Sequence, residues 1–315
     1  MPAHPPLVHS TLDVFGHPYH VVTAGDGPLV LLCHGFPEHW TSWRHQIPAL
    51  VNGGYRIAAP DMLGYGRSAK PPIVSEYNIV RIVDDLREIA RQLDSAQTLV
   101  VGHDWGAIAA WHFAMLHPAA VKAVAGLSVP FTPRTSEPVI PLLRALFGDR
   151  FNYLLYFQQV GPADAELARD PQRSLARVTP PPTEKWPADG TGMLSETPEH
   201  PPIPPWHTGE SFGELVDEYA RTGFTGGLNW YRNIDLNWEL TAELSDATID
   251  QPSLFIGGEH DPAIALTPVD ELDRYLRDLR GAHVLPDTGH WVQQERPELT
   301  NDLLLAFLSS VSAPK

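Results

Sequence analysis

This 315-residue chain has little cysteine, few basic side chains and no long apolar run. Its single cysteine, Cys33, excludes an internal disulfide bond. Lys and Arg number 22 against 38 Asp and Glu, so the formal net charge is −16 at pH 7. Nucleic acids and anionic membranes are therefore not expected as partners, because basic side chains are needed to neutralise phosphates. No uncharged stretch approaches the roughly 20 apolar residues that span a bilayer.

The same scarcities bear on where the protein works. The first six residues carry neither the basic nor the apolar segment of a secretory signal, and with one cysteine we expect a protein of the reducing cytoplasm. Arginine far outnumbers lysine, and alanine and proline are frequent. This composition favours a bacterial source with a GC-rich genome, a hypothesis that the coding sequence would test. A homodimer is left open as an alternative to a monomer.

Short apolar runs alternate with segments of helical periodicity, which is typical of a mostly parallel sheet flanked by helices. The periodicity predicts an amphipathic helix over residues 78–93, and the almost wholly apolar residues 107–115 predict a helix packed on the middle of the sheet. Strands are predicted at residues 10–16, 18–24, 28–33, 55–60, 98–103, 122–128, 252–257 and 281–286.

The alternation stops near Pro130 and resumes near Pro252. The sequence therefore predicts a core of residues 1–131 and 246–315 and an inserted, mainly helical cap of residues 132–245. Within the cap, residues 171–206 are rich in proline, including Pro180–Pro182, and we expect a long irregular loop there because proline cannot donate a backbone hydrogen bond.

Asp104 is the strongest candidate for a catalytic residue. It lies in Val-Gly-His-Asp-Trp-Gly, residues 101–106, directly after an apolar run. A sharp turn from strand to helix needs small residues on both sides of the nucleophile, and Gly102 and Gly106 meet this requirement. Most hydrolases with this turn have serine at the central position. A carboxylate can instead displace a leaving group from a saturated carbon and form an ester that water cleaves.

Partners for Asp104 follow in the order nucleophile, acid, histidine. Asp261 lies in Gly-Gly-Glu-His-Asp-Pro and His290 in Asp-Thr-Gly-His-Trp, each after a predicted strand. We expect His290 to deprotonate the water that attacks the ester, and Asp261 to orient the imidazole. The backbone N–H groups of Phe36 and Trp105 are the expected oxyanion hole, because His34-Gly35-Phe36-Pro37 follows the third predicted strand. Pro37 is expected to shape this loop, with a cis bond to Phe36 as one way of doing so.

On these residues the chain resembles the epoxide hydrolases of the α/β-hydrolase fold, which open epoxides to vicinal diols. The resemblance covers nearly the whole chain. It includes residues 34–38, 42–44, 61–68 and 102–106, the loops of Asp261 and His290, and the cap segments 152–158 and 228–233. The Gln-Gln-Val-Gly-Pro that follows Phe157 departs from the family, which more often has proline before this glycine.

The resemblance implies two ring-opening acids in the cap, Tyr153 and Tyr231. A phenol suits this task because it stays protonated at neutral pH and is a far stronger acid than the alcohol it helps to form. A small apolar epoxide and water are the implied substrates, with no cofactor and no metal. Substrate contacts are expected from five further residues: His34, Pro37, His103, Trp230 and Trp291.

Several alternatives stay open at this point. Tyr156 lies one helical turn from Tyr153 and could be the first acid instead. A haloalkane dehalogenase would use the same nucleophile, acid and base, with the Trp105 indole binding halide, but would have no use for two phenols. A fluoroacetate dehalogenase is disfavoured because it would have arginine in place of Trp105. A protein of this fold that binds a small ligand without turnover is a third alternative.

Three other patterns have simpler interpretations. Taken singly, an Asp in a Gly-flanked turn is more often a turn residue than a nucleophile. Gly64-Tyr65-Gly66-Arg67-Ser68-Ala69 matches a dinucleotide-binding pattern formally, but Pro71 and Pro72 interrupt the required helix, so we expect a turn. The spacing of His34, His39 and His103 does not suggest a metal site. We expect His34 and His103 to form hydrogen bonds around the site and His39 to lie on the surface.

Overall fold

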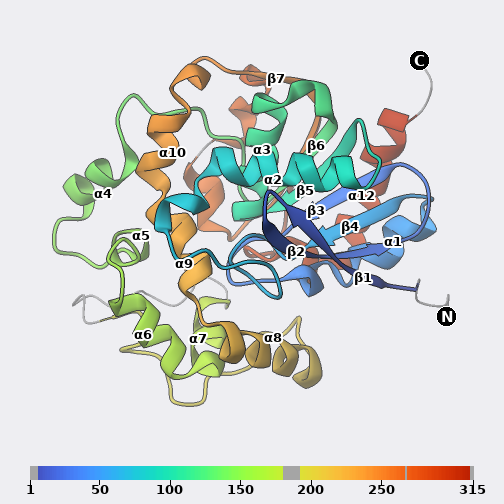
Figure 1. Ribbon diagram of the computed structural model, residues 1–315. Helices are drawn as coiled ribbons and strands as arrows, with labels where there is room; N and C mark the ends of the chain where they lie inside the picture. The colour runs from blue at the N-terminus through green and yellow to red at the C-terminus, as the bar shows by residue number, and fades with distance from the viewer. Residues whose placement is uncertain (1–5, 180–191, 267, 313–315) are drawn as a thin grey trace.

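An eight-stranded sheet forms the centre of the computed structural model, which describes residues 6–179, 192–266 and 268–312 (Figure 1). The strands lie in the order β1-β2-β4-β3-β5-β6-β7-β8. β2 pairs antiparallel with β1 and β4, and the other neighbours are parallel, so the predicted mostly parallel sheet is confirmed. Their bounds are β1 Val8–Val14, β2 His17–Ala24, β3 Leu29–Cys33, β4 Arg56–Pro60, β5 Thr98–His103, β6 Val121–Leu127, β7 Ile249–Gly258 and β8 Leu276–Leu285.

Helices cover both faces of the sheet because successive side chains of a buried strand point to opposite faces. In β3, Leu29, Leu31 and Cys33 face one apolar cluster, while Val30 and Leu32 face the other. The first cluster is completed by α2 (Ile79–Gln92) and α3 (Trp105–Leu116), and the second by α1 (Gln46–Asn52) and α12 (Pro297–Ser312).

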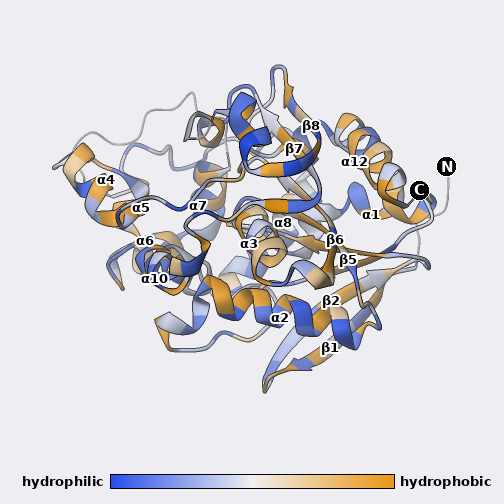
Figure 2. Ribbon diagram, turned by 90° about the horizontal axis from the view of Figure 1, so that it is seen from above, coloured by the Kyte–Doolittle hydropathy of each residue, from blue (hydrophilic) through white to orange (hydrophobic). Residues whose placement is uncertain are grey.

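The two predicted core helices are confirmed and differ as expected. Residues 79–92 form α2, on which buried Ile82, Leu86 and Ile89 alternate with charged residues, so hydrophobic and hydrophilic segments alternate along its ribbon in Figure 2. α3 packs against both β5 and α2. It has apolar side chains on nearly every side because it lies between two layers.

The helices α4–α10 come between β6 and β7 in the chain, and in space they lie to one side of the sheet (Figure 1). They fall within residues 132–245, the stretch for which the sequence predicts a cap. Their bounds are α4 Val139–Phe147, α5 Tyr153–Tyr156, α6 Pro162–Arg169, α7 Pro171–Val178, α8 Gly209–Thr222, α9 Thr225–Arg232 and α10 Ile234–Leu240. Among the described residues, no helix combines the length and the apolarity needed to cross a bilayer.

Short helices complete the chain. α11, Val292–Glu295, follows β8 and precedes α12. The 3-10 helices are η1 Trp40–Trp43, η2 Val74–Tyr77, η3 Pro118–Ala120, η4 Ala242–Leu244, η5 Pro262–Leu266 and η6 Val269–Arg274. Residues 64–69 form turns, as predicted, with Gly64 N–H donating to the Ala69 carbonyl at 2.9 Å.

Three predictions need correction. The predicted loop of residues 171–206 begins with α7, because Pro171 occupies the first helical turn, where the missing N–H costs nothing, and Asp170 caps the Arg173 N–H at 3.0 Å. Residues 192–208 form turns without helix or strand, and residues 180–191, including Pro180–Pro182, lie outside the described residues. His39 is buried rather than on the surface.

The third correction concerns β8, which begins five residues before the predicted start at 281. Residues 276–280 read Leu-Arg-Asp-Leu-Arg, in which three charged residues interrupt the apolar pattern expected of a strand. They form a strand nonetheless because β8 lies at the edge of the sheet, where charged side chains reach water and discourage pairing with another chain.

The packing of α3 can be tested with Phe113, whose side chain is fully buried. Phe113→Ala should lower the free energy of unfolding by about 3–5 kcal/mol, because it removes apolar contact and leaves a cavity. Phe15→Ala is the matched control, since Phe15 is 62% exposed, and it should change the free energy by less than about 0.5 kcal/mol. Urea unfolding followed by fluorescence measures both; equal effects would contradict the packing described.

Candidate active site

Asp104 lies at the point where β5 turns into α3. Its backbone has φ 54° and ψ −122°, a conformation that a residue with a side chain adopts only under strain. The turn packs so closely against β3 that position 106 requires glycine, because a Cβ there would lie 2.0 Å from the Cys33 carbonyl oxygen. The elbow predicted from the sequence is therefore present, and it places the Asp104 carboxylate at the carboxyl end of the parallel strands.

The loop after β3 contacts this carboxylate directly. The Phe36 N–H donates to Asp104 Oδ1 at 2.8 Å, and the Phe36–Pro37 peptide bond is cis. A Cβ at Gly35 would lie 2.2 Å from Asp104 Oδ1, so only glycine fits there. Trp105 is the first residue of α3, and its N–H is one of those that a helix leaves without an intrahelical partner. Both predicted oxyanion donors thus lie beside Asp104.

His290 lies between two carboxylates. Its Nδ1 is 2.8 Å from Asp261 Oδ2, and its Nε2 is 3.5 Å from Asp104 Oδ2. Burial alone would lower the pKa of His290, but Asp261 and Asp104 outweigh it and hold this pKa well above its ordinary value. Burial likewise opposes ionisation of Asp261, yet the facing imidazole keeps its pKa below the usual value. The raised pKa of His290 favours the imidazolium form, which lies between the Asp261 and Asp104 side chains.

Tyr153 on α5 and Tyr231 on α9 face the same site, with ring centroids 6.1 Å apart. Burial raises the pKa of Tyr153, and the charges of Asp104 and Asp261 raise it further. The pKa of Tyr231 is also raised, first by burial and then by Asp104, while a hydrogen bond from the Trp105 side chain opposes the rise. Both phenols therefore stay protonated at neutral pH and can donate to an oxygen.

Tyr156 points elsewhere. Its hydroxyl donates to Glu166 Oε2 at 2.9 Å, and Glu166 also accepts the N–H groups of Met193 and Leu194. The geometry therefore favours Tyr153 over Tyr156 as the first cap acid, the choice that spacing alone could not make.

A buried carboxylate, Glu38, supports the site from behind. Glu38 Oε2 lies 2.8 Å from His103 Nδ1 and accepts the Gly35 N–H at 3.1 Å. His103 Nε2 lies 2.9 Å from the His290 carbonyl, which also accepts the Ser128 hydroxyl. Although burial opposes ionisation, His103 and the hydrogen bonds lower the pKa of Glu38 to about 2. Glu38 thus links the oxyanion loop to the backbone of the base.

Sequence reasoning treated Glu38 only as part of a motif and missed Ser128. Nothing in the sequence marks Ser128, whose role depends on contact with a residue 162 positions away.

Most of the other residues predicted to contact substrate already bond to or pack against other parts of the protein. His34 Nε2 accepts the Met62 N–H at 3.0 Å, and Trp230 donates to the Leu63 carbonyl at 2.9 Å. Pro37 borders a cavity of about 10 Å³, which has room for about one water molecule. Trp291 packs edge-on against His290, at 5.0 Å between ring centroids. Contacts of these residues and of His103 with substrate stay predictions.

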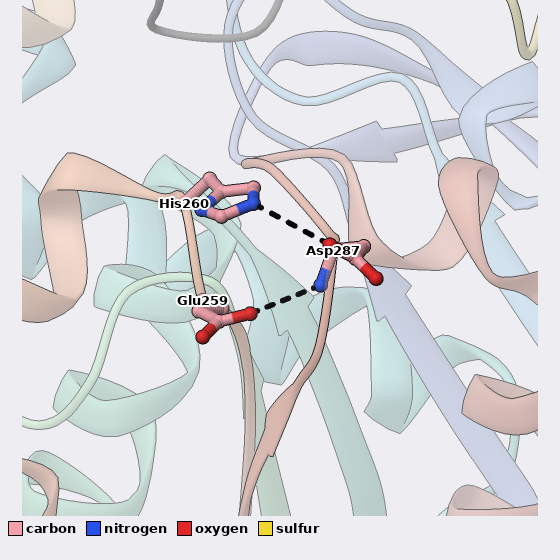
Figure 3. A group of neighbouring side chains, drawn as sticks. All are labelled: Glu259, His260 and Asp287. Carbon is pink, nitrogen blue, oxygen red and sulfur yellow. Dashed lines mark hydrogen bonds and ion pairs between the residues drawn. The ribbon is translucent and has the colours of Figure 1, made fainter.

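Among the described residues, one group of side chains meets the geometry of a metal site: Glu259, His260 and Asp287 (Figure 3). All three are exposed. Glu259 Oε2 already accepts the Asp287 N–H at 3.1 Å, and His260 Nε2 lies 3.9 Å from Asp287 Oδ1. These contacts join the loop of Asp261 to the loop of His290, so the group has a structural explanation without an ion.

Known proteins share this arrangement of the whole chain. The family model of the alpha/beta hydrolase fold matches residues 28–297. Epoxide hydrolase A of Mycobacterium tuberculosis is 42% identical over 311 residues, which cover 95% of this chain and 97% of that protein. Among solved structures, epoxide hydrolase A from Mycobacterium thermoresistibile has a TM-score of 0.91 at 42% identity, covering 96% of this chain and 98% of that chain. An epoxide hydrolase from an endophytic Streptomyces has a TM-score of 0.92 at 40% identity, covering 97% and 96%.

The charge arrangement predicts how His290 responds to its neighbour. Asp104→Asn removes one of the two facing carboxylates, so the pKa of His290 should fall toward its ordinary value of about 6.5. Imidazole resonances followed by NMR across pH measure this directly. Asp278→Asn, on the exposed face of β8, is the control and should leave the titration unchanged. An unchanged pKa in Asp104→Asn would show that the two residues are not coupled.

Proposed function

The chain belongs to the α/β-hydrolase fold family and is an epoxide hydrolase, and we propose that Asp104 opens the epoxide ring by forming a covalent ester. The observation that carries this assignment is the position of the Asp104 carboxylate, bound by the Phe36 N–H through Oδ1 and facing His290 through Oδ2. In the proposal, residues 132–245 act as a cap that brings two phenols over this carboxylate.

Ring opening is the first step. Asp104 Oδ2 attacks a ring carbon as the bond from that carbon to the epoxide oxygen breaks, while Oδ1 stays with the Phe36 N–H. Tyr153 and Tyr231 donate to the departing oxygen, which takes up a proton as it becomes a hydroxyl.

The ester changes the electrostatics around His290. Asp104 loses its negative charge on alkylation, so the pKa of His290 falls and the imidazolium can release its proton. That proton balances the one taken up by the epoxide oxygen, with the tyrosines as relay. His290 is then neutral and ready to act as a base.

Ester hydrolysis is the second step. His290 takes a proton from water, the hydroxide adds to the ester carbonyl, and the Phe36 and Trp105 N–H groups stabilise the oxygen that becomes anionic. The bond from the carbonyl carbon to the diol oxygen then breaks, the diol takes up the proton of the new carboxyl group, and Asp104 is again a carboxylate. His290 ends as the imidazolium of the resting enzyme.

The Trp105 side chain also bears on the main alternative, haloalkane dehalogenation. That reaction would need the indole N–H for the departing halide, whereas here the Trp105 ring packs edge-on against the Tyr231 ring, at 5.1 Å between ring centroids. This contact supports epoxides as the substrates of this site. We further infer a small apolar epoxide, because the aromatic side chains of Phe36, Phe157 and Trp105 surround Tyr231. A cytoplasmic location, a bacterial source and a homodimer stay predictions.

Tyrosine variants test the proposal. Tyr153→Phe and Tyr231→Phe should each slow ring opening by about 100-fold, the usual contribution of a general acid, and the double variant should lose ring opening. Single-turnover mixing with styrene oxide, followed by tryptophan fluorescence and diol release, measures the step.

Tyr156→Phe is the matched control, because its hydroxyl binds Glu166 instead of facing the nucleophile, and it should keep the wild-type rate. Halide release from bromo- or chloroalkanes without diol formation from epoxides would contradict the proposal. So would wild-type ring opening in both active-site tyrosine variants.

A further inference from the structure

Tyr153 lies on a helix too short to be stable by itself. α5 is a single turn, Tyr153–Tyr156, and the first turn of a helix is unfavourable because one hydrogen bond does not offset the ordering of its residues. Asn152 caps the N-terminal end by accepting the Leu155 N–H at 3.2 Å. The other end of α5 is held by α9, the helix that carries Tyr231.

Arg232 makes most of these contacts. Its Nε donates at 3.0 Å to the carbonyl of Phe157, the C-cap residue of α5, and its Nη2 donates at 3.2 Å to the Gln159 carbonyl in the segment that follows. The guanidinium also forms an ion pair with Asp164 at the start of α6. Only 2% of the Arg232 side chain is exposed, and its charge-assisted bonds to the Phe157 carbonyl and to Asp164 are partly buried, whereas the bond to the Gln159 carbonyl lies at the surface.

Gln158 makes the reciprocal contact. Its Nε2 donates to the Leu154 carbonyl at 2.8 Å and to the Tyr231 carbonyl at 3.0 Å. Each tyrosine segment thus binds the backbone of the other: Arg232 follows Tyr231 and holds the end of α5, while Gln158 follows α5 and holds Tyr231. We call Arg232 and Gln158 the tyrosine clamp.

α9 is in turn fixed to the core. Trp230 donates to the Leu63 carbonyl at 2.9 Å, and Asn233 Nδ2 donates to the Val74 carbonyl at 2.7 Å. These bonds lie on either side of Tyr231. The core therefore sets the position of Tyr231, and the tyrosine clamp transmits that position to Tyr153.

Resting on the proposed function, we propose that Arg232 and Gln158 are positioning residues for ring opening, which fix the spacing of the Tyr153 and Tyr231 phenols over Asp104. Neither side chain needs to touch the substrate. Ring opening requires both phenols to reach one oxygen, whereas ester hydrolysis uses His290, Asp261 and the oxyanion hole of the core. Loss of the clamp should therefore slow the first step and spare the second.

Single-turnover kinetics with styrene oxide separates the two steps. Arg232→Met keeps the length of the side chain but removes its donors; it should slow ring opening by about 100-fold, the effect of an error of about 1 Å in position, and leave ester hydrolysis within about twofold of wild type. Arg232→Lys should recover part of the loss, since one ammonium can replace some of the bonds.

Arg173→Met is the matched control. Arg173 is also a cap arginine that donates to carbonyls, but its acceptors Pro198 and Leu194 lie outside both tyrosine segments. It should lower stability without changing the ratio of the two rate constants. If Arg232→Met does not fold, Gln158→Leu is judged by the same ratio.

An unchanged rate of ring opening in folded Arg232→Met, or an equal fall in both steps, would overturn the proposal. Tyr153→Phe in the same assay separates this failure from a wider one. If Tyr153→Phe slows ring opening and Arg232→Met does not, only the clamp is wrong. If neither variant slows it, the assignment of the cap acids fails as well.

Discussion

One electrostatic arrangement governs this site: the His290 imidazole lies between the carboxylates of Asp261 and Asp104. Two negative charges stabilise the imidazolium in the resting enzyme, and only one remains once Asp104 has become an ester. In the proposed cycle the same residue is thus held protonated before ring opening and released as a base after it. No movement of the backbone is needed for this change, because the covalent step itself removes the charge.

The fold supplies this arrangement through the carboxyl ends of neighbouring strands. Asp104 follows β5, Phe36 follows β3, Asp261 follows β7 and His290 follows β8. Residues far apart in the chain therefore meet at one edge of the sheet, as in other open α/β sheets. Glu38 and His103 connect the loop of Phe36 to the loop of His290. The contacts among Glu259, His260 and Asp287 connect the loop of Asp261 to the loop of His290. In the proposal, residues 132–245 add the two acids, Tyr153 and Tyr231, whose positions depend on α9 and its bonds to the core.

Much of this could be predicted from the sequence because it depends on local rules. The buried strands, the amphipathic α2 and the elbow at Asp104 all follow from short-range patterns of apolar and small residues. The start of α7 was missed although its signals are local, namely Asp170 as the cap and Pro171 in the first turn. Other predictions were wrong where partners distant in sequence decide the outcome: the edge strand β8 extends into charged residues, and His39 is buried among neighbours that the sequence does not reveal. The choice between Tyr153 and Tyr156 needed Glu166, and the role of Ser128 needed His290.

The central claim is that the oxygen added to the substrate comes first from Asp104 and only then from water. A single turnover with excess enzyme in H₂¹⁸O tests it most directly. The account predicts an unlabelled diol and ¹⁸O in the peptide that contains Asp104, since water attacks the ester carbonyl and the diol keeps the original carboxylate oxygen. A diol labelled in the first turnover, with no label in Asp104, would show direct attack by water and contradict the account.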